Sequence, residues 1–294
     1  MLRVTDQTMT MSAQRSLGAR QARLAAAQDT ASSGARITRP SDDPVGTGDA
    51  LRVRAQIAAT SQYQRNINDG TGWLTTLDST LGTATGLLRQ ARDLAIQGSN
   101  GSLNQDAKNA LAQQVDSLRK DLLSAANTRY LGRNVFAGTS DAADAFTDGA
   151  PPTFNGAPGN TVQRRIGPDQ TVQVDADGAA VFGSGTASVF TVLDGISSDL
   201  RSGLDPSAQI TALDNGMKAV MSGRADIGSR LARLQRAGQS TAAAQTSLEV
   251  QRSGIEDMDL GKAAMDLQLQ QTAYQAALAV TAKVLQPSLT DFLK

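Results

Sequence analysis

The spacing of the prolines constrains this chain more than any other feature. Its eight prolines leave three long stretches without any, residues 1–39, 45–150 and 207–286. Proline breaks a helix interior because it lacks the amide donor and its ring clashes with the preceding turn. The three stretches therefore permit long helices. Four of the prolines fall within residues 136–190, which sets the middle of the chain apart.

Apolar residues inside these stretches follow helical spacing. One seam consists of Ile67, Leu74, Leu77, Leu81, Ala84, Leu88, Ala91 and Ala95. After the turn-like residues 98–102 a second seam consists of Leu111, Val115, Leu118, Leu122 and Ala125. Alternating intervals of three and four residues are typical of helices that pack in a coiled-coil-like bundle. The two seams predict a pair of long antiparallel helices.

The C-terminal part repeats this pattern. Its seam consists of Leu260, Ala264, Leu267, Gln271, Tyr274, Leu278, Thr281 and Leu285, and an earlier helix contains Ile227, Leu231 and Leu234. A further helix is predicted over residues 5–33, where Leu17 and Leu24 are the only leucines and two methionines the only other large aliphatic side chains. Burying so few apolar side chains compensates for only a small part of the conformational entropy that the segment loses when it becomes ordered. We therefore expect this helix to need partners along its length.

The middle of the chain has a different composition. Five of the six phenylalanines lie within residues 136–190, and short runs such as 171–174 and 179–182 read as small strands flanking a turn. We expect a mainly α fold in which long antiparallel helical arms are built from both ends of the chain, with a small β-rich insertion. The expected domains are residues 1–40 with 255–294, residues 41–135 with 191–254, and the insertion 136–190.

Composition excludes several functions. The chain has no His and no Cys, which removes the usual zinc sites, disulfides and Ser-His-Asp or Cys-His catalysis. Its 28 basic and 28 acidic residues cancel, so no overall field attracts nucleic acid or an anionic membrane. No apolar run is long enough for a membrane span or a secretory signal. We expect no cofactor, no metal, and neither nucleic acid nor membrane as a partner.

Two motifs allow an enzymatic interpretation. The carboxylates of Asp42 and Asp43 could serve acid-base chemistry, but Ser41 before them and Pro44 after them are typical of a capped helix start. The pair Ser117 and Lys120 matches the S-x-x-K pattern of serine acyl-enzymes, without the accompanying motifs and in mid-helix. We interpret residues 41–44 as a structural cap and expect no enzyme.

The remaining motifs have structural explanations. Residues 175–178 resemble the opening of a calcium loop but lack its downstream Glu, so a turn is favoured. Residues 183–185 lack the rest of a phosphate-binding loop. The basic pairs Arg164 with Arg165 and Arg52 with Arg54 have no interleaved aromatics that could stack bases.

Several blocks together carry a family likeness. Residues 31–37 (ASSGARI) and 39–46 (RPSDDPVG) resemble the N-terminal block of bacterial flagellin-like axial proteins, and the PSDDP version is closer to members at the hook-filament junction than to filament flagellins. Residues 126–128, Gly132 and 136–138 are similar to the block that closes the second long helix of that family. The C-terminal blocks around residues 260–276 and 289–293 resemble its assembly helix.

The resemblance implies a structural subunit of the flagellum that is exported unfolded through the type III channel and lies outside the cell. It implies as partners copies of the chain in a ring, a hook-associated protein on the hook side, flagellin or a second junction protein on the filament side, and an export chaperone at the C-terminal helix. The implied assembly residues are Leu17, Leu24, Ile37, Leu260, Leu267, Tyr274, Leu278, Leu285, Leu289 and Phe292. The residues themselves agree with this, since a chain without disulfides and with weakly apolar ends can be threaded and then ordered by neighbours.

Three alternatives stay open at this point. The runner-up within the same class is a filament flagellin, which would be distinguished by its growth into long filaments. A hydrolase or transferase would need a pocket that gathers Ser117 with Lys120, or one around the Asp42–Asp43 pair. A helical signalling module would remain inside the cell.

Overall fold

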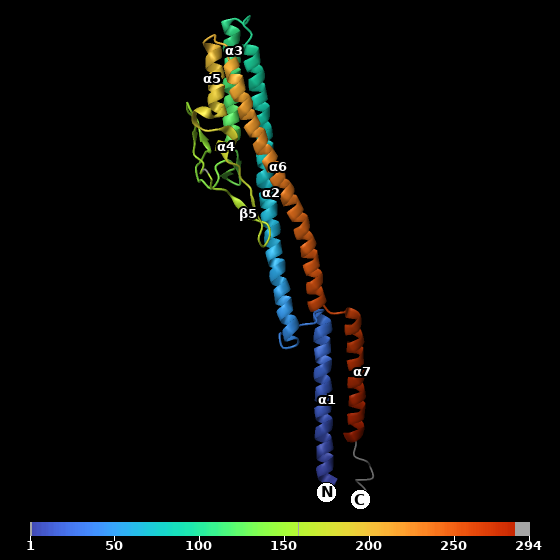
Figure 1. Cartoon of the computed structure of the whole chain (residues 1–294). Helices are drawn as coiled ribbons and strands as arrows, with labels where there is room; N and C mark the ends of the chain where they lie inside the picture. The colour runs from blue at the N-terminus through green and yellow to red at the C-terminus, as the bar shows by residue number, and fades with distance from the viewer. Residues whose placement is uncertain (1, 158, 286–294) are drawn as a thin grey trace. The chain divides into compact units, whose positions relative to one another are not determined.

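The computed structural model describes residues 2–157 and 159–285, with helices from both ends of the chain and short strands in the middle (Figure 1). The helices are α1 (Leu2–Ser33), α2 (Pro44–Gly98), α3 (Gln105–Ala126), α4 (Gly178–Phe182), α5 (Val189–Arg201), α6 (Ser207–Glu256) and α7 (Leu260–Leu285), with a 3-10 turn η1 (Gly185–Ala187). The strands are β1 (Arg129–Tyr130), β2 (Arg133–Asn134), β3 (Phe146–Thr147), β4 (Thr153–Phe154), β5 (Gln163–Arg165) and β6 (Thr171–Gln173). The predicted fold class is confirmed.

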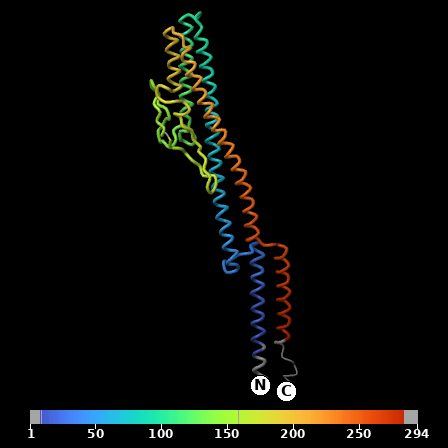
Figure 2. Tube along the Cα trace, viewed as in Figure 1, coloured from blue at the N-terminus to red at the C-terminus, as the bar shows by residue number. Residues whose placement is uncertain are grey.

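The chain divides into two compact units. The terminal unit consists of residues 1–59 and 245–294, and the central unit of residues 60–244. Figure 2 shows the path of the chain, in which the first and last helices belong to the terminal unit and the strands to the central unit. Each unit is described separately.

A single apolar stripe on α2 forms the centre of the core of the central unit. All eight residues of the first predicted seam, Ile67 to Ala95, are buried. Facing them are Leu111, Val115 and Leu122 of α3 with residues of α5 and α6, among them Leu193, Ile196, Leu213, Val220, Ile227 and Leu234. Burial of each large aliphatic side chain contributes about 1.5–3 kcal/mol, so this seam accounts for much of the stability of the central unit.

Ion pairs between arginine and aspartate connect the helices of the central unit. The guanidinium of Arg119 on α3 is almost buried, and it reaches Asp148 at 2.8 Å and Asp194 of α5 at 2.6 Å. Burial raises the pKa of Asp194, whereas the hydrogen bond from Arg119 lowers the pKa of Asp148. Arg92 and Arg224 make similar pairs between α2 and α6, with Asp214 at 2.7 Å and Asp78 at 2.8 Å.

The strands form three two-stranded antiparallel sheets within the described residues, β1 with β2, β3 with β4, and β5 with β6. Phenylalanine rings fill the space between them and the helices. Phe146 lies 5.2 Å from Phe190 and 5.9 Å from Phe182, measured between ring centroids. The strand expected at residues 179–182 is wrong, because Asp177 accepts a hydrogen bond from Ala179 N and starts the short helix α4 instead.

The β1–β2 hairpin has an unusual tip. Tyr130 pairs with Arg133, which leaves Leu131 and Gly132 as a two-residue loop. Both have positive φ, 49° for Leu131 and 81° for Gly132. Turns of this kind favour Asn-Gly, because a side chain with a Cβ pays about 1–2 kcal/mol in the left-handed region. Leu131 therefore occupies a strained position, and its side chain is 78% exposed.

The terminal unit is built on α1 and α7, which lie side by side (Figure 1). They are antiparallel, because Ala35 just after α1 forms a β-bridge with Asp257 just before α7. Among the described side chains of this unit, the buried hydrophobic residues are only Ala50, Val53 and Ala263. The terminal unit thus has no apolar core comparable to that of the central unit.

The α2 seam can be tested by truncating one of its members. Leu88→Ala removes a fully buried side chain and should lower the free energy of unfolding by about 2–5 kcal/mol. Ile96→Ala, on the same helix but 47% exposed, is the matched control and should cost less than about 1 kcal/mol. Urea unfolding followed by circular dichroism measures both. Equal losses for the two variants would contradict the assignment of the core.

Candidate assembly interface

The half-buried residues of α1 form a seam with helical spacing. Leu17 and Leu24 belong to it, together with Ala13, Arg20, Ala27 and Ala31. Intervals of three and four residues place them on one face, toward the neighbouring α7. Each of these side chains is partly exposed, so the contact between α1 and α7 is only partly shielded from solvent.

The covered face of α7 differs by about one residue from the seam predicted in the sequence. Ala263 is buried, and Leu267, Gln270, Ala273, Tyr274, Ala277 and Thr281 are half-buried. Of the predicted assembly residues, Leu267 and Tyr274 therefore lie on the covered face, while Leu260 and Leu278 are 67% and 41% exposed. Leu285 ends α7 and its side chain is not described, and Leu289 and Phe292 lie outside the described residues.

A second apolar stripe lies on an exposed face of α7, about 120° around the helix from the covered face. Met265, Leu269 and Val280 are 67%, 64% and 62% exposed. Their spacing of four and eleven residues puts them within about 60° of one another around the helix, together with Ala276. The outer stripe, as we call these four residues, is not among the predicted assembly residues, because it has the same helical period as the predicted seam.

The loop between α1 and α2 is tied to the junction between α6 and α7. Arg36 N donates to Glu256 O at 2.7 Å, and Met258 N donates to Gly34 O at 3.0 Å. The guanidinium Nε of Arg36 adds a bond to Ile255 O at 2.9 Å. These bonds anchor the start of α7 beside the end of α1, and Gly34 supplies the positive φ of 66° needed where α1 ends.

Residues 41–44 form the start of α2. The Oδ1 of Asp43 accepts from Gly46 N at 2.8 Å, and Pro44 is the first residue of the helix. The Oδ2 of Asp42 accepts from Thr38 Oγ1 and Arg39 N, each at 2.8 Å. These hydrogen bonds lower the pKa of both carboxyl groups, which stay ionised as acceptors. Ser41 is exposed beside them, its hydroxyl 3.5 Å from the carboxylate of Asp42.

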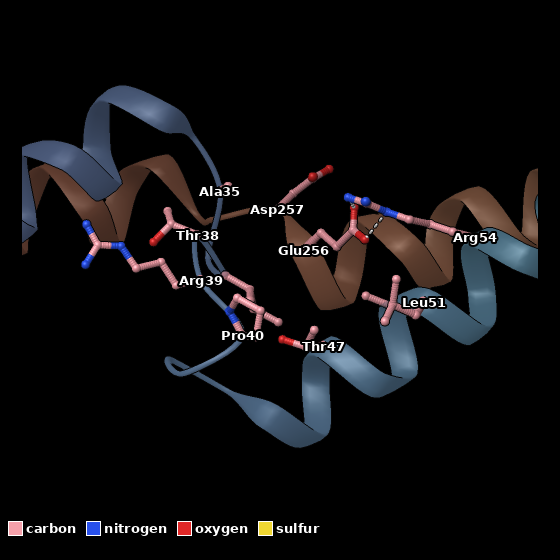
Figure 3. A pocket seen from close by; sticks show the side chains of 11 residues that line it. Ala35, Thr38, Arg39, Pro40, Thr47, Leu51, Arg54, Glu256 and Asp257 are labelled. Atoms are coloured by element: carbon pink, nitrogen blue, oxygen red, sulfur yellow. Dashed lines mark hydrogen bonds and ion pairs between the residues drawn. The ribbon is translucent and has the colours of Figure 1, made fainter.

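A cavity of about 270 Å³ opens beside this loop (Figure 3). Its walls are the half-buried Ile37 with Ala35, Pro40, Ala50 and Leu51, and at one side Arg54 binds Glu256 through Nε at 2.6 Å and Nη2 at 2.8 Å. Both carboxylate oxygens of Glu256 are thus engaged by one guanidinium. The cavity offers an apolar wall and a closed ion pair, which suits packing better than acid-base chemistry.

The other sequence candidates are dispersed. Ser117 and Lys120 are both exposed on α3, and the groove that Ser117 lines contains Asp93 and Asp121 rather than Lys120. Asp175 is buried, accepts from Val162 N at 2.9 Å, and has a pKa raised by burial. Asp177 caps α4, so residues 175–178 serve local structure.

The basic pairs are engaged as well. Arg164 binds Asp69 at 2.6 Å and lies 6.0 Å from the Trp73 ring, and Arg52 binds Asp49 at 2.6 Å. Across the described ranges no three acidic side chains are grouped so that they could hold a metal ion. Nor does any helix within those ranges have the length and apolar character to cross a membrane.

Comparison with known proteins gives a family. Residues 4–141 match the bacterial flagellin N-terminal helical region, and residues 210–293 match the flagellin C-terminal helical region. Flagellar hook-associated protein 3 of Escherichia coli is 28% identical over 275 residues, which cover 84% of this chain and 85% of that protein. A flagellin of Halalkalibacterium halodurans is 26% identical over 276 residues, covering 94% and 93%.

Solved structures share the fold. The flagellar junction protein of Legionella pneumophila has a TM-score of 0.59 at 15% identity and covers 71% of this chain and 99% of its own. The two matched regions contain α2, α3 and α7 and nearly all of α1 and α6, the helices that make the arms and the paired ends. The chain therefore belongs to the flagellin-like structural proteins of the bacterial flagellum.

Proposed function

We propose that this chain is the subunit that joins hook to filament, acting without catalysis by packing its helices against neighbouring subunits. Its similarity over most of both chains to hook-associated protein 3 of Escherichia coli supports this position in the flagellum. The alternative is a filament flagellin, supported by the similarity to the protein of Halalkalibacterium halodurans.

The outer stripe of α7 is the observation that carries the proposal. A helix that is apolar on both faces is stable in water only when both faces are covered. Within the described part of one chain, α1 covers one face and leaves Met265, Leu269 and Val280 exposed. Another subunit is the cover that fits, because a second copy supplies a helix pair of the same length and spacing.

The predicted assembly residues have distinct places in this proposal. Leu17, Leu24, Leu267 and Tyr274 hold α1 against α7, Leu260 and Leu278 lie at the exposed edge of that contact, and Ile37 lines the cavity beside α2. Leu285, Leu289 and Phe292 complete the proposed set of assembly residues. Copies in a ring would supply the lateral neighbours, with a hook-associated protein on the hook side and flagellin or a second junction protein on the filament side.

The same arrangement assigns a role to each part of the chain. Residues 1–40 with 255–294 would line an inner tube, residues 41–135 with 191–254 would form the surrounding bundle, and residues 136–190 would face outward. A chain free of cysteine can leave the cell unfolded through the flagellar export channel and reach its place outside the cell without forming disulfides. An export chaperone at the C-terminal helix would cover the outer stripe before assembly.

Charge substitutions at exposed leucines of α7 test the interface. Leu269→Asp in the outer stripe and Leu278→Asp at the exposed edge of the contact with α1 place a carboxylate where a neighbour would bury it, and each should remove the protein from sheared flagella and abolish motility. Gln275→Asp, an exposed polar position on the same helix, is the control and should assemble normally. The melting temperature of each purified variant should match that of the parent. Normal filaments and motility with Leu269→Asp would refute the proposed interface.

Amide hydrogen exchange on the monomer tests whether the ends depend on neighbours. The amides of α1 and α7 should exchange with little protection, because Ala263 is the only fully buried hydrophobic residue among their described side chains, while those of α2 along the seam should be protected. Mass spectrometry of peptic fragments resolves the two groups. Equal protection of α1 and the α2 seam in the monomer would contradict the dependence on neighbours.

Seeded polymerisation separates the junction protein from a flagellin. Purified chain added to sheared filament fragments should add a limited layer and stop if it is a junction subunit. Growth of long filaments, seen by electron microscopy, would support the flagellin alternative instead.

A further inference from the structure

We propose that Leu131, at the tip of the β1–β2 hairpin, inserts into the groove between α4 and α6 of a neighbouring copy. The inference rests on the proposed function, because it supplies a lateral contact between identical subunits of the ring. It concerns the central unit alone and makes no use of the outer stripe of α7.

Leu131 has the properties of an intermolecular anchor. Its side chain is 78% exposed and takes the backbone conformation that leucine adopts least readily, with φ of 49°. Neither property stabilises the subunit itself, since Gly or Asn would form the same turn without strain. Strained residues are retained where they serve a contact or a reaction, so the strain points to a use outside the subunit.

The groove offers a matching site on the same unit. It has a volume of about 540 Å³, and Ala176, Val181, Ala219 and Ile227 form its apolar wall. At its base Val181 of α4 packs closely on Gly223 of α6, where a Cβ would lie 3.0 Å from Val181 Cγ2. An aliphatic side chain would therefore find apolar atoms around it, as interface anchors do in well-packed pockets.

The charges around the two features are opposite. Arg129 and Arg133 flank Leu131 and are each about half exposed. Asp177 and Asp226 line the groove and are exposed, with Arg230 bound to Asp226. Arg133 lies 3.9 Å from Asp141, a long contact that leaves it able to bind a new carboxylate, whereas Arg129 Nη2 already donates to Ala143 O and lies 3.3 Å from Asp144. Complementary rims of this kind orient an encounter more than they strengthen it.

The positions of the two features suit a ring. Tyr130 of the hairpin lies against Gly72, and Arg224 beside the groove binds Asp78, only six residues further along α2, or about 9 Å. Residues 135–137, directly after β2, are bonded to the groove, since Ala176 N donates to Val135 O at 3.2 Å and Ala137 bridges Asp177. Hairpin tip and groove are therefore two different surfaces of the same unit. A contact between them is heterologous, so each copy can give its hairpin to one neighbour and its groove to another.

Disulfide trapping tests the contact directly, because the natural chain has no cysteine. The double variant Leu131→Cys with Ala180→Cys places one thiol at the tip and one on an exposed residue that lines the groove. Oxidation of sheared flagella carrying it should give a ladder of linked subunits on non-reducing gels. The control, Leu131→Cys with Leu204→Cys, places its second thiol at a 60% exposed leucine outside the groove and should stay monomeric. No ladder from the first variant, or equal ladders from both, would overturn the proposal.

A single substitution gives an independent readout. Leu131→Gly relieves the strained φ and removes the side chain, so the melting temperature of the monomer should stay the same or rise. Incorporation at the hook tip should nevertheless fall about tenfold, the effect expected for loss of one interface anchor. Normal incorporation of this variant would overturn the proposal.

The two proposals fail in different ways. If the parent protein is absent from sheared flagella, the proposed function fails. If the parent is present and the trapped ladder is missing, only the hairpin contact fails.

Discussion

Burial of one stripe of leucine and alanine on α2 is the interaction on which the central unit depends. Because the eight seam residues between Ile67 and Ala95 are all buried, α3, α5 and α6 have a common surface to pack on, and the β sheets have a rigid base. The terminal unit has no equivalent. Its described side chains bury only two alanines and one valine, so the same helical architecture is self-sufficient in one unit and incomplete in the other.

Much of the fold could be read from the sequence, since long helices with a regular seam leave a strong periodic signal. The seam from Ile67 to Ala95 was predicted residue by residue, as was the start of α2 at Pro44. Short elements were harder. Residues 179–182 are apolar enough for a strand, but Asp177 caps them as a helix, and four residues carry too little periodicity to decide.

The pairing of α1 with α7 could be predicted only in part. Leu267 and Tyr274 lie on the half-buried face of α7, as their spacing suggests, whereas the exposure of Leu260 and Leu278 depends on where α1 lies, which no local pattern records. The outer stripe was present in the sequence as a second period. Leu131 could not be recognised at all, because its significance comes from a backbone conformation and an exposure that only three-dimensional structure reveals.

The backbone bonds between residues 34–36 and 255–258 impose an order on folding. Arg36 and Ile255 are 219 positions apart, so the terminal unit cannot close until nearly the whole polypeptide is available. Residue 244, by contrast, completes the central unit. Contacts that join such distant positions form late, because the intervening chain must first be arranged. Any protein that binds α7 during this interval prevents α1 from pairing with it. Binding at one end of the chain thus keeps both terminal helices unpaired.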